Sequence, residues 1–339
     1  MRESDSTGLP GPWLRWRATR ELWTAADIGD LSGRAAVVTG SCRGIGAAVA
    51  EHLARHGARV IIACSSSAHG RTAAAAVRQK VASAQVDSVV CELAEPTQVR
   101  QCADQIISLT AGRLDLLVNN AAVAAVPFAR TADGNEMHFA VNHLGHFTLT
   151  GHLLPALLNA PQPRVVNVSS ILHWLGRCRS DRPHLPRRYH RWRAYFDSKL
   201  ANLLFTQGLS AWADTHELPL LALSAHPGLV NTTLGSSALH ADRRHAEARL
   251  LESMQARWHS PSHAAWPLLR AATDANAANG DFYGPGGRWE WSGTPVRVRA
   301  AHRALDARAI ARLWDLSQQL TRHSFPVSPT QSARKDNPA

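Results

Sequence analysis

The sequence predicts an α/β protein built as three layers (α/β/α), with a doubly wound parallel sheet between two layers of helices. Short apolar runs recur along the 339 residues without polar alternation, and a helical pattern follows each run. Such runs are typical of parallel strands that are buried on both faces. A glycine cluster after the first run, at Gly40, Gly44 and Gly46, indicates a tight turn from strand to helix. No linker interrupts this alternation, which predicts one domain.

Each expected element has a local pattern. The expected strands are 35–39, 58–63, 88–91, 114–118, 164–168, 220–224 and a short run near Phe282. The expected helices are 44–56, 69–84, 96–109, 134–159, 194–215, 261–273 and 305–320. Gly57 ends the first helix and Pro96 opens the third, the positions that these residues favour. In the last helix, Ile310, Leu313 and Trp314 share one side.

The ends of the chain look different from its middle. Residues 1–30 contain three Trp but no clear period, and we expect an N-terminal extension there. The single domain is expected over 31–324, including a basic insert at 171–194. The polar tail at 325–339 is expected to be flexible.

Positive charge is concentrated in the basic insert. The net charge is +11, and this segment sets seven Arg against Asp181 alone. These are Arg177, Arg179, Arg182, Arg187, Arg188, Arg191 and Arg193. The rest of the chain is only mildly basic, so no nucleic-acid partner is expected.

Other features bear on the cellular setting. No run of 18 or more residues is apolar and uncharged, so no membrane span is expected. The five cysteines form no CxxC pair and suggest neither a disulfide framework nor a zinc site. They are Cys42, Cys64, Cys91, Cys102 and Cys178. The His residues also lack metal-ligand spacing, so no metal is expected. A reducing cytoplasm fits these features best.

The segment TGSCRGIG at 39–46 is suited to bind a pyrophosphate. Its glycines let the backbone turn tightly at a helix N-terminus, where free N–H groups and the helix dipole attract anions. The spacing is GxxxGxG instead of GxGxxG. The alternative interpretation is a tight turn that serves packing only.

The sequence favours NADP(H) over NAD(H) as the cofactor. The second strand ends in Ala63, Cys64, Ser65 and Ser66, without the acidic residue that would bind a ribose 2′-hydroxyl and repel a 2′-phosphate. Arg43 lies within the glycine loop, and a cation beside small hydroxyls suits a phosphate. The alternative is that Arg43 is simply solvated.

Tyr195 and Lys199 are one helical turn apart in a chain with three Tyr and only three Lys. A phenol with a pKa of about 10 is a poor acid–base catalyst at pH 7. A nearby ammonium would lower that pKa, and Lys can also bind ribose hydroxyls. The alternative is an incidental pair on a surface helix.

Together these motifs resemble the short-chain dehydrogenase/reductase superfamily, and within it the branch similar to retinol dehydrogenases and WW-domain oxidoreductases. The resemblance covers roughly residues 23–325. Its markers are WTAADIGDLSGRAAVVTG at 23–40, TGSCRGIG at 39–46, NNAA at 119–122, VNHLGHF at 141–147, VVNVSS at 165–170, YFDSKLANLLFT at 195–206, HPGLVNTTL at 226–234 and YGPGG at 283–287. All eight occur in order along the chain, which implies a Rossmann fold.

The resemblance implies a role for each matched residue. Tyr195 is the general acid in ketone reduction and the base in alcohol oxidation; Lys199 assists it and holds the nicotinamide ribose. Ser170 hydrogen-bonds the substrate oxygen, and Asn142 anchors a proton-relay water. Cofactor contacts are implied at Gly40, Ser41, Arg43, Gly44, Ile45, Gly46, Ser65, Glu92, Leu93, Asn119, Ala121, Tyr195, Lys199, Pro227, Gly228, Val230 and Thr232. The last four match the segment that holds the nicotinamide carboxamide in the family.

Three positions depart from the family pattern. Ala122 replaces a Gly, Glu92 replaces an Asp, and Ser65 stands where relatives often have Arg. The first change would crowd the cofactor, and the last leaves Arg43 as the main indication of NADP(H). None of them alters the four expected catalytic residues. The resemblance is compatible with a homodimer.

The basic insert is expected to lie over the catalytic residues. It suggests a lid that favours a substrate with an anionic handle; the alternatives are solvated Arg or steering of cofactor phosphates. An amphipathic helix within 235–257 would form the other wall. Its expected apolar face carries Leu250, Leu251, Met254 and Trp258.

The predicted function is NADP(H)-dependent reduction of a ketone or aldehyde of a small organic molecule, or oxidation of the corresponding secondary alcohol. The alternative is a non-redox protein on the same fold, either a cofactor-sensing regulator or an isomerase or cyclase. An intact set of Ser170, Tyr195, Lys199 and Asn142 favours the enzyme.

Overall fold

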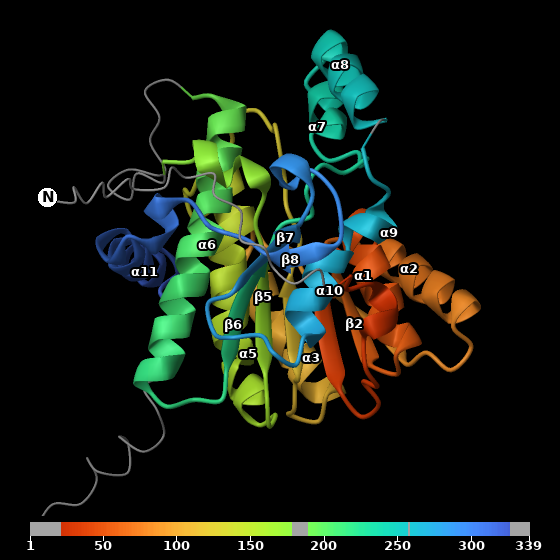
Figure 1. Ribbon diagram of the computed structural model, residues 1–339. Coiled ribbons are helices and arrows are strands. Elements are labelled where there is room, and N and C mark those ends of the chain that lie inside the picture. Colours follow the sequence, from red (N-terminus) through yellow and green to blue (C-terminus); the bar gives the residue numbers. More distant parts are fainter. Residues whose placement is uncertain (1–21, 178–188, 257, 326–339) are drawn as a thin grey trace, which may run out of the picture.

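The computed structural model describes residues 22–177, 189–256 and 258–325. These residues form one eight-stranded sheet between two layers of helices (Figure 1), so the predicted fold class is confirmed. The strands are β1 (Ala35–Thr39), β2 (Arg59–Cys64), β3 (Val86–Val90), β4 (Leu116–Asn119), β5 (Arg164–Val168), β6 (Leu221–Ala225), β7 (Phe282–Pro285) and β8 (Pro295–Arg297). Their order is β3-β2-β1-β4-β5-β6-β7-β8. All neighbours pair in parallel except β7 and β8.

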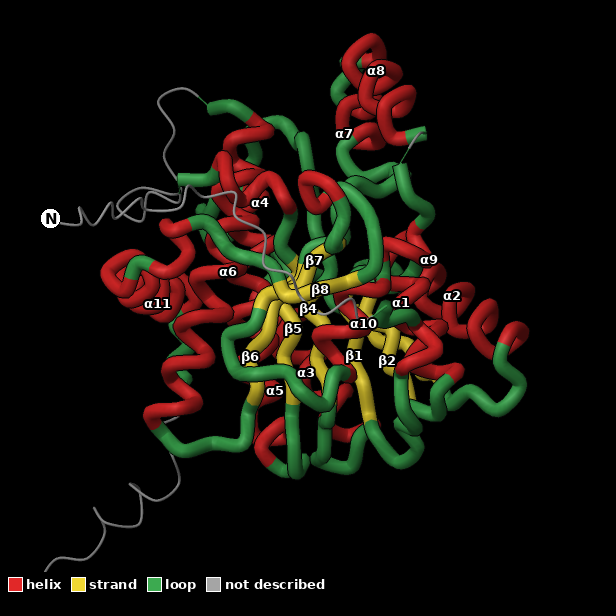
Figure 2. The backbone as a smooth tube through the Cα atoms, in the orientation of Figure 1, coloured by secondary structure: helices red, strands yellow, loops and turns green. Residues whose placement is uncertain are grey.

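The helices divide between the two faces of the sheet (Figures 1 and 2). One layer contains α1, α2, α9 and α10; the other contains α3, α5 and α6, with α11 packed on α6. Their bounds are α1 (Gly44–Arg55), α2 (Ser67–Lys80), α3 (Pro96–Leu109), α4 (Met137–Phe139), α5 (Gly145–Leu158), α6 (Arg191–Thr215), α7 (Ser236–Ala241), α8 (His245–Gln255), α9 (Pro261–Ala264), α10 (Trp266–Thr273) and α11 (Ala307–Thr321).

The strands lack polar alternation because both of their faces are covered. In β1, Ala36 and Val38 belong to one apolar cluster, whereas Ala35 and Val37 belong to the cluster on the opposite face. Burying a side chain of this size contributes about 1.5–3 kcal/mol. The sheet is therefore stabilised from both sides. Since helices cover its two faces, a ligand site would have to lie at the ends of its strands.

The structure departs from the expected elements in several places. The helix expected at 134–159 is interrupted by a π-helical turn at Ala140–Leu144, and β8 was not predicted. The helix expected within 235–257 is two helices, α7 and α8, because Arg243 adopts a left-handed conformation between them (φ 57°). Its expected apolar face was wrong in part, since Leu250 is 63% and Met254 50% exposed.

Both ends of the described chain take part in the core. Trp23 and Ile28 belong to the cluster beside α10. Phe325 is buried, and its ring lies 4.8 Å from that of Trp314 on α11. Residues 1–21 and 326–339 lie outside the described residues. They make up most of the expected N-terminal extension and most of the expected tail.

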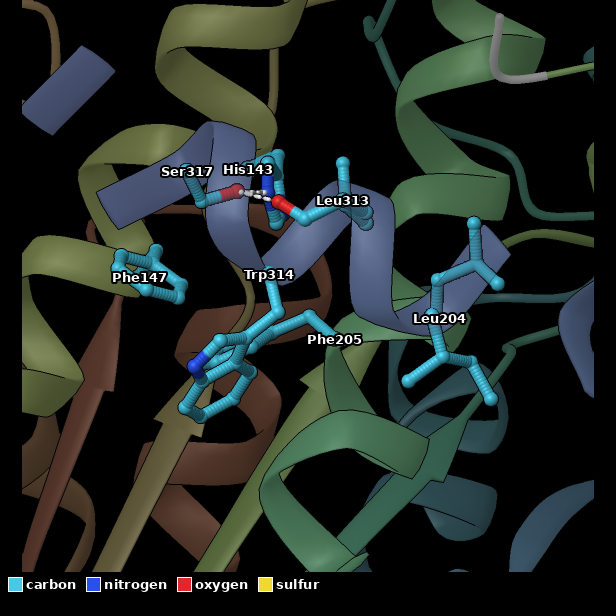
Figure 3. A pocket seen from close by; sticks show the side chains of 8 residues that line it. His143, Phe147, Leu204, Phe205, Leu313, Trp314 and Ser317 are labelled. Carbon is cyan, nitrogen blue, oxygen red and sulfur yellow. Dashed lines mark hydrogen bonds between the residues drawn. The ribbon is translucent and has the colours of Figure 1, made fainter. Parts of the chain in front are cut away.

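Figure 3 shows how α11 closes over the body of the protein. Leu313, Trp314 and Ser317 pack against His143 and Phe147, and the remaining gap is too narrow for a water molecule. The Ser317 hydroxyl donates to the Leu313 carbonyl, so His143 Nε2–H donates to Ser317 Oγ (2.8 Å). Burial lowers the pKa of His143 to about 3 and keeps it neutral. This region packs side chains and is not a ligand site.

One covalent feature contradicts the sequence prediction. Cys42, in the glycine loop, forms a disulfide with Cys64, the last residue of β2. The absence of a CxxC pair did not exclude it, because parallel pairing of β1 with β2 brings residues far apart in sequence together. Their Cα atoms are 6.3 Å apart. Cys91 and Cys102 are free and buried, and Cys178 lies outside the described residues.

The disulfide should stabilise the fold. Cys42→Ser is expected to lower the free energy of unfolding by about 3 kcal/mol, because the bond closes a loop between residues 22 apart. Urea denaturation without reductant measures this difference. Adding reductant should bring the wild type to the level of the variant and leave the variant unchanged; equal stability of the two without reductant would contradict the prediction.

Candidate functional site

The site lies at the carboxyl ends of the strands, where the sheet changes winding direction between β1 and β4. In doubly wound sheets this switch point is the usual ligand crevice. Gly40 has a positive φ (65°), and a Cβ there would lie 2.7 Å from Ala121 Cα. A Cβ on Gly46 would lie 2.5 Å from Asn120 Nδ2. The glycine loop is therefore packed directly against the end of β4.

The glycine loop leads into the N-terminus of α1. Arg43 occupies the N-cap position but makes no side-chain capping bond, so first-turn N–H groups of this 12-residue helix remain available to an anion. Ser41 is buried and donates to the Val38 carbonyl (2.6 Å), which fixes the loop. Ile45 packs on the core. The geometry fits the pyrophosphate of a dinucleotide.

Two candidate phosphate ligands stand on either side of the disulfide. Arg43 follows Cys42 and Ser65 follows Cys64, and both side chains are exposed. The Cα atoms of the two disulfide-linked cysteines are 6.3 Å apart, so the Arg43 and Ser65 side chains lie at the same edge of the sheet. A cation and a hydroxyl there can contact one phosphate group.

The other expected cofactor residues line the same edge. Glu92 accepts a hydrogen bond from Ala94 N–H (3.2 Å), whereas Leu93 is buried against Gly145 of α5. Asn119, at the end of β4, donates to Asn167 Oδ1 (2.9 Å) and so links β4 to β5. Ala121 packs beside Gly40, as described above. The cofactor contact expected at Leu93 is restricted by this burial.

The four expected catalytic residues come from three segments. Tyr195 and Lys199 lie one turn apart on α6, with the Lys199 ammonium 5.7 Å from the centre of the Tyr195 ring. Ser170, just after β5, is hydrogen-bonded to the Tyr195 side chain. Asn142 lies in the π-helical turn and donates to Ser198 Oγ (2.9 Å), next to Lys199. The structure thus gathers all four around the same point.

Burial controls the protonation of the pair on α6. It raises the pKa of Tyr195 to about 12, which the hydrogen bond with Ser170 partly opposes. It also lowers the pKa of Lys199 to about 7. The predicted lowering of the Tyr195 pKa was therefore wrong for this structure, because both groups have lost their water. Lys199 donates one hydrogen bond to the Val168 carbonyl (3.1 Å).

The segment after β6 closes the crevice from the other side. Gly228 has a positive φ (73°), and Val230 forms an isolated bridge with His259. The methyl group of Thr232 lies 3.9 Å from the Cβ position of Gly44. Pro227 is half-buried at the start of this turn. The expected nicotinamide segment therefore reaches back to the glycine loop.

Sequence reasoning missed several buried polar residues around the site. His173 Nδ1 donates to the Ser170 carbonyl (2.7 Å), and its Nε2 accepts from Ala301 N–H (3.1 Å). Tyr189 Oη donates to Glu136 Oε1 (3.1 Å) and lies 3.0 Å from His138 Nδ1. The His138 ring lies 6.4 Å from that of Tyr195. The position of His173, three residues after the VVNVSS motif, could have indicated it. No spacing in the sequence indicated the contact of Tyr189 with Glu136 and His138.

The basic insert is only partly described. Arg191 forms an ion pair with Asp242 (2.6 Å) beside α7, and also donates to the Ala125 carbonyl (2.9 Å). The neighbouring Trp192 donates to Glu247 on α8 (3.1 Å). Arg179, Arg182, Arg187 and Arg188 lie outside the described residues. The described part therefore joins α6 to the pair of helices that projects from the body (Figure 1).

Several large apolar side chains are exposed in segments that follow the carboxyl ends of the strands. Most of the exposed ones in the described chain follow β4, β5, β6 or β7. They are Phe128, Trp174, Leu175, Leu234, Leu250, Met254, Trp289 and Trp291. We call this set the apolar rim. None of the described helices is long and apolar enough to cross a membrane.

Comparison with known proteins agrees with this geometry. The family model for short chain dehydrogenases matches residues 34–243. Retinol dehydrogenase 12 of Mus musculus is 40% identical over 200 residues, which are 59% of this chain and 62% of that protein, so the match spans less than two thirds of the relative. Polyprenol dehydrogenase of Homo sapiens is 32% identical over 292 residues, 85% of each chain.

A solved structure resembles nearly the whole chain. The crystal structure of an uncharacterised protein from Mycobacterium paratuberculosis has a TM-score of 0.72 and 38% identity, covering 90% of this chain and 99% of that one. Family model, relatives and fold thus agree with the site at the carboxyl ends of the strands. The chain belongs to the short-chain dehydrogenase family, in its retinol-dehydrogenase-like branch.

Proposed function

We propose that this protein is an NADP(H)-dependent oxidoreductase that interconverts a carbonyl group and an alcohol on a small molecule with an apolar body. The observation that carries the proposal is the gathering of Ser170, Tyr195 and Lys199 beside a glycine loop that fits a dinucleotide. When bound, the nicotinamide cofactor supplies or accepts the hydride.

In reduction, Tyr195 donates its phenol proton to the substrate oxygen. Its pKa of about 12 keeps the phenol protonated at neutral pH, so the proton to be transferred is present. The Ser170 hydroxyl donates a hydrogen bond to the same oxygen and stabilises its developing charge. Lys199 would hold the ribose hydroxyls of the bound cofactor, and its protonated form would favour the phenolate that proton transfer leaves. Oxidation follows the reverse order.

The proposed preference for NADP(H) rests on the side chains of Arg43 and Ser65, which follow the two disulfide-linked cysteines. Arg43 supplies a cation and Ser65 a hydroxyl at the end of β2, where no carboxylate opposes a 2′-phosphate. Retinol and polyprenol dehydrogenases among the relatives indicate the type of chemistry but not this preference.

Arg43→Ala should therefore raise KM for NADPH about tenfold or more, and raise KM for NADH much less, because a charge-assisted hydrogen bond contributes about 1.5–3 kcal/mol. Steady-state kinetics with both cofactors at a fixed substrate concentration measure the two changes. Arg34→Ala, away from the glycine loop, serves as the control. Equal changes for NADPH and NADH would contradict the preference.

The apolar rim supports a substrate with an apolar body. Exposed apolar side chains around a crevice mark a surface that binds apolar groups. The names of the relatives, retinol dehydrogenase and polyprenol dehydrogenase, point to alcohols of this kind. In the described part of the basic insert, Asp242 neutralises Arg191, whereas Arg177 and Arg193 are exposed, so an anionic handle stays the alternative.

A series of linear aldehydes of increasing length tests the substrate class. We expect kcat/KM with NADPH to rise severalfold with each added pair of methylenes, since each buried CH₂ contributes about 0.8 kcal/mol. Replacement of the terminal methyl by a carboxylate should remove the gain. A flat series, or a preference for the carboxylates that falls steeply with salt, would favour the anionic handle instead.

A further inference from the structure

We propose that Glu290, on the loop between β7 and β8, is a positioning residue that fixes the nicotinamide-binding turn at Pro227–Gly228 through His226. This inference rests on the proposed role of that turn in cofactor binding. Glu290 lies 64 residues away from His226 in the sequence, and no motif connects them.

A chain of two hydrogen bonds links Glu290 to the turn. The His226 side chain is fully buried, and its Nε2 lies 2.9 Å from Glu290 Oε2. Its Nδ1 lies 3.2 Å from the Gly228 nitrogen, which can only donate. An ionised carboxylate only accepts, so the ring proton belongs on Nε2 and the Nδ1 lone pair accepts from Gly228 N–H. Glu290 thereby selects the tautomer that the turn requires.

The backbone of the same loop supports the turn directly. Leu229 N–H donates to the Trp291 carbonyl (3.0 Å). A Cβ on Gly228 would lie 2.5 Å from that carbonyl oxygen, so the two segments touch. Gly284, in β7, leaves room for the imidazole, because a Cβ there would lie 2.1 Å from His226 Nε2. The loop between β7 and β8, the His226 ring and the turn at Pro227–Gly228 therefore form one packed unit.

The loop adopts an uncommon conformation to present the carboxylate. Trp289 and Glu290 both have positive φ angles (59° and 55°). Left-handed conformations of residues other than Gly cost free energy and persist where the surroundings hold them. Apolar burial does not explain this one, since Trp289 and Trp291 are each 52% exposed. The conformation brings the loop into contact with His226, Gly228 and Leu229.

Binding of whole cofactors and of their adenosine fragments tests the proposal. The ligands are NADPH and NADH, and the fragments without nicotinamide are adenosine 2′,5′-bisphosphate and AMP. Glu290→Ala should weaken binding of the whole cofactor about tenfold and leave the corresponding fragment unchanged, because only nicotinamide reaches the turn. Glu290→Gln should stay within about threefold of the wild type, since its amide oxygen still accepts from Nε2–H.

Glu252→Ala is the matched control. Glu252 forms a similar pair with His240 (2.9 Å), but on the projecting α8, and its loss should change no affinity. If Glu290→Ala weakens cofactor and fragment equally, or weakens neither, the inference is overturned. A different result would contradict the proposed cofactor function itself: the wild type would bind neither NADPH nor NADH more tightly than it binds the corresponding fragment. The failure of the inference about Glu290 can therefore be told apart from the failure of the proposed function.

Discussion

Tyr195→Phe is expected to reduce kcat by about a thousandfold, while the affinity for NADPH changes little. The substitution removes only the phenol oxygen, so the ring keeps its packing on α6, yet no group of similar pKa remains to donate the proton. General acid catalysis contributes about 10²–10⁴ in rate. NADPH consumption with an aldehyde measures kcat, and quenching or enhancement of cofactor fluorescence measures binding.

Tyr283→Phe is the control for this change. Its hydroxyl is also buried and hydrogen-bonded, but to Asp274 (3.3 Å), near α10. Loss of that hydroxyl should leave kcat nearly unchanged. If Tyr195→Phe and the wild type consume NADPH at the same rate, Tyr195 is not the general acid and the proposed mechanism is wrong.

Lys199→Met is expected to abolish most activity and yet to stabilise the cofactor-free protein at pH 6, by up to about 5 kcal/mol. Burial lowers the pKa of Lys199 from 10.5 to about 7. The unfolded chain therefore binds more protons between these two values, so the stability of the wild type rises with pH across that window. Below pH 7 the wild type bears the full cost of a buried ammonium, which Met does not have.

The advantage of the variant should consequently shrink from pH 7 upward and vanish near pH 10. Thermal or urea unfolding at pH 6, 8 and 10 provides the test. Lys80→Met is the control, because the ammonium of Lys80 is largely exposed and pairs with Glu51 (2.7 Å). A stability gain that does not depend on pH would mean that packing, and not charge burial, explains it.

The sequence predicted those parts of the fold that depend on local patterns. Apolar runs such as 35–39 and 164–168 indicated buried parallel strands, and helical periodicity alone placed Tyr195 and Lys199 on one face. The glycine spacing likewise indicated the tight turn before α1. These predictions succeeded because neighbouring residues decide them.

Features that depend on tertiary pairing were not predicted. The Cys42–Cys64 disulfide requires the register of β1 against β2, and the Glu290–His226 pair requires an antiparallel β8 behind a left-handed turn. The protonation of Tyr195 and Lys199 also depends on how much water the surrounding segments exclude. A single sequence specifies such arrangements only through the complete fold.

The pair formed by α7 and α8 packs on the body through a small separate cluster, in which Leu239 and Ala248 meet Ala125, with Leu251 of α8 and Trp192 of α6 packed against it. This cluster is small, so its local opening should cost much less free energy than global unfolding. The segment that carries Leu250 and Met254 should therefore open locally while the sheet and the glycine loop stay folded.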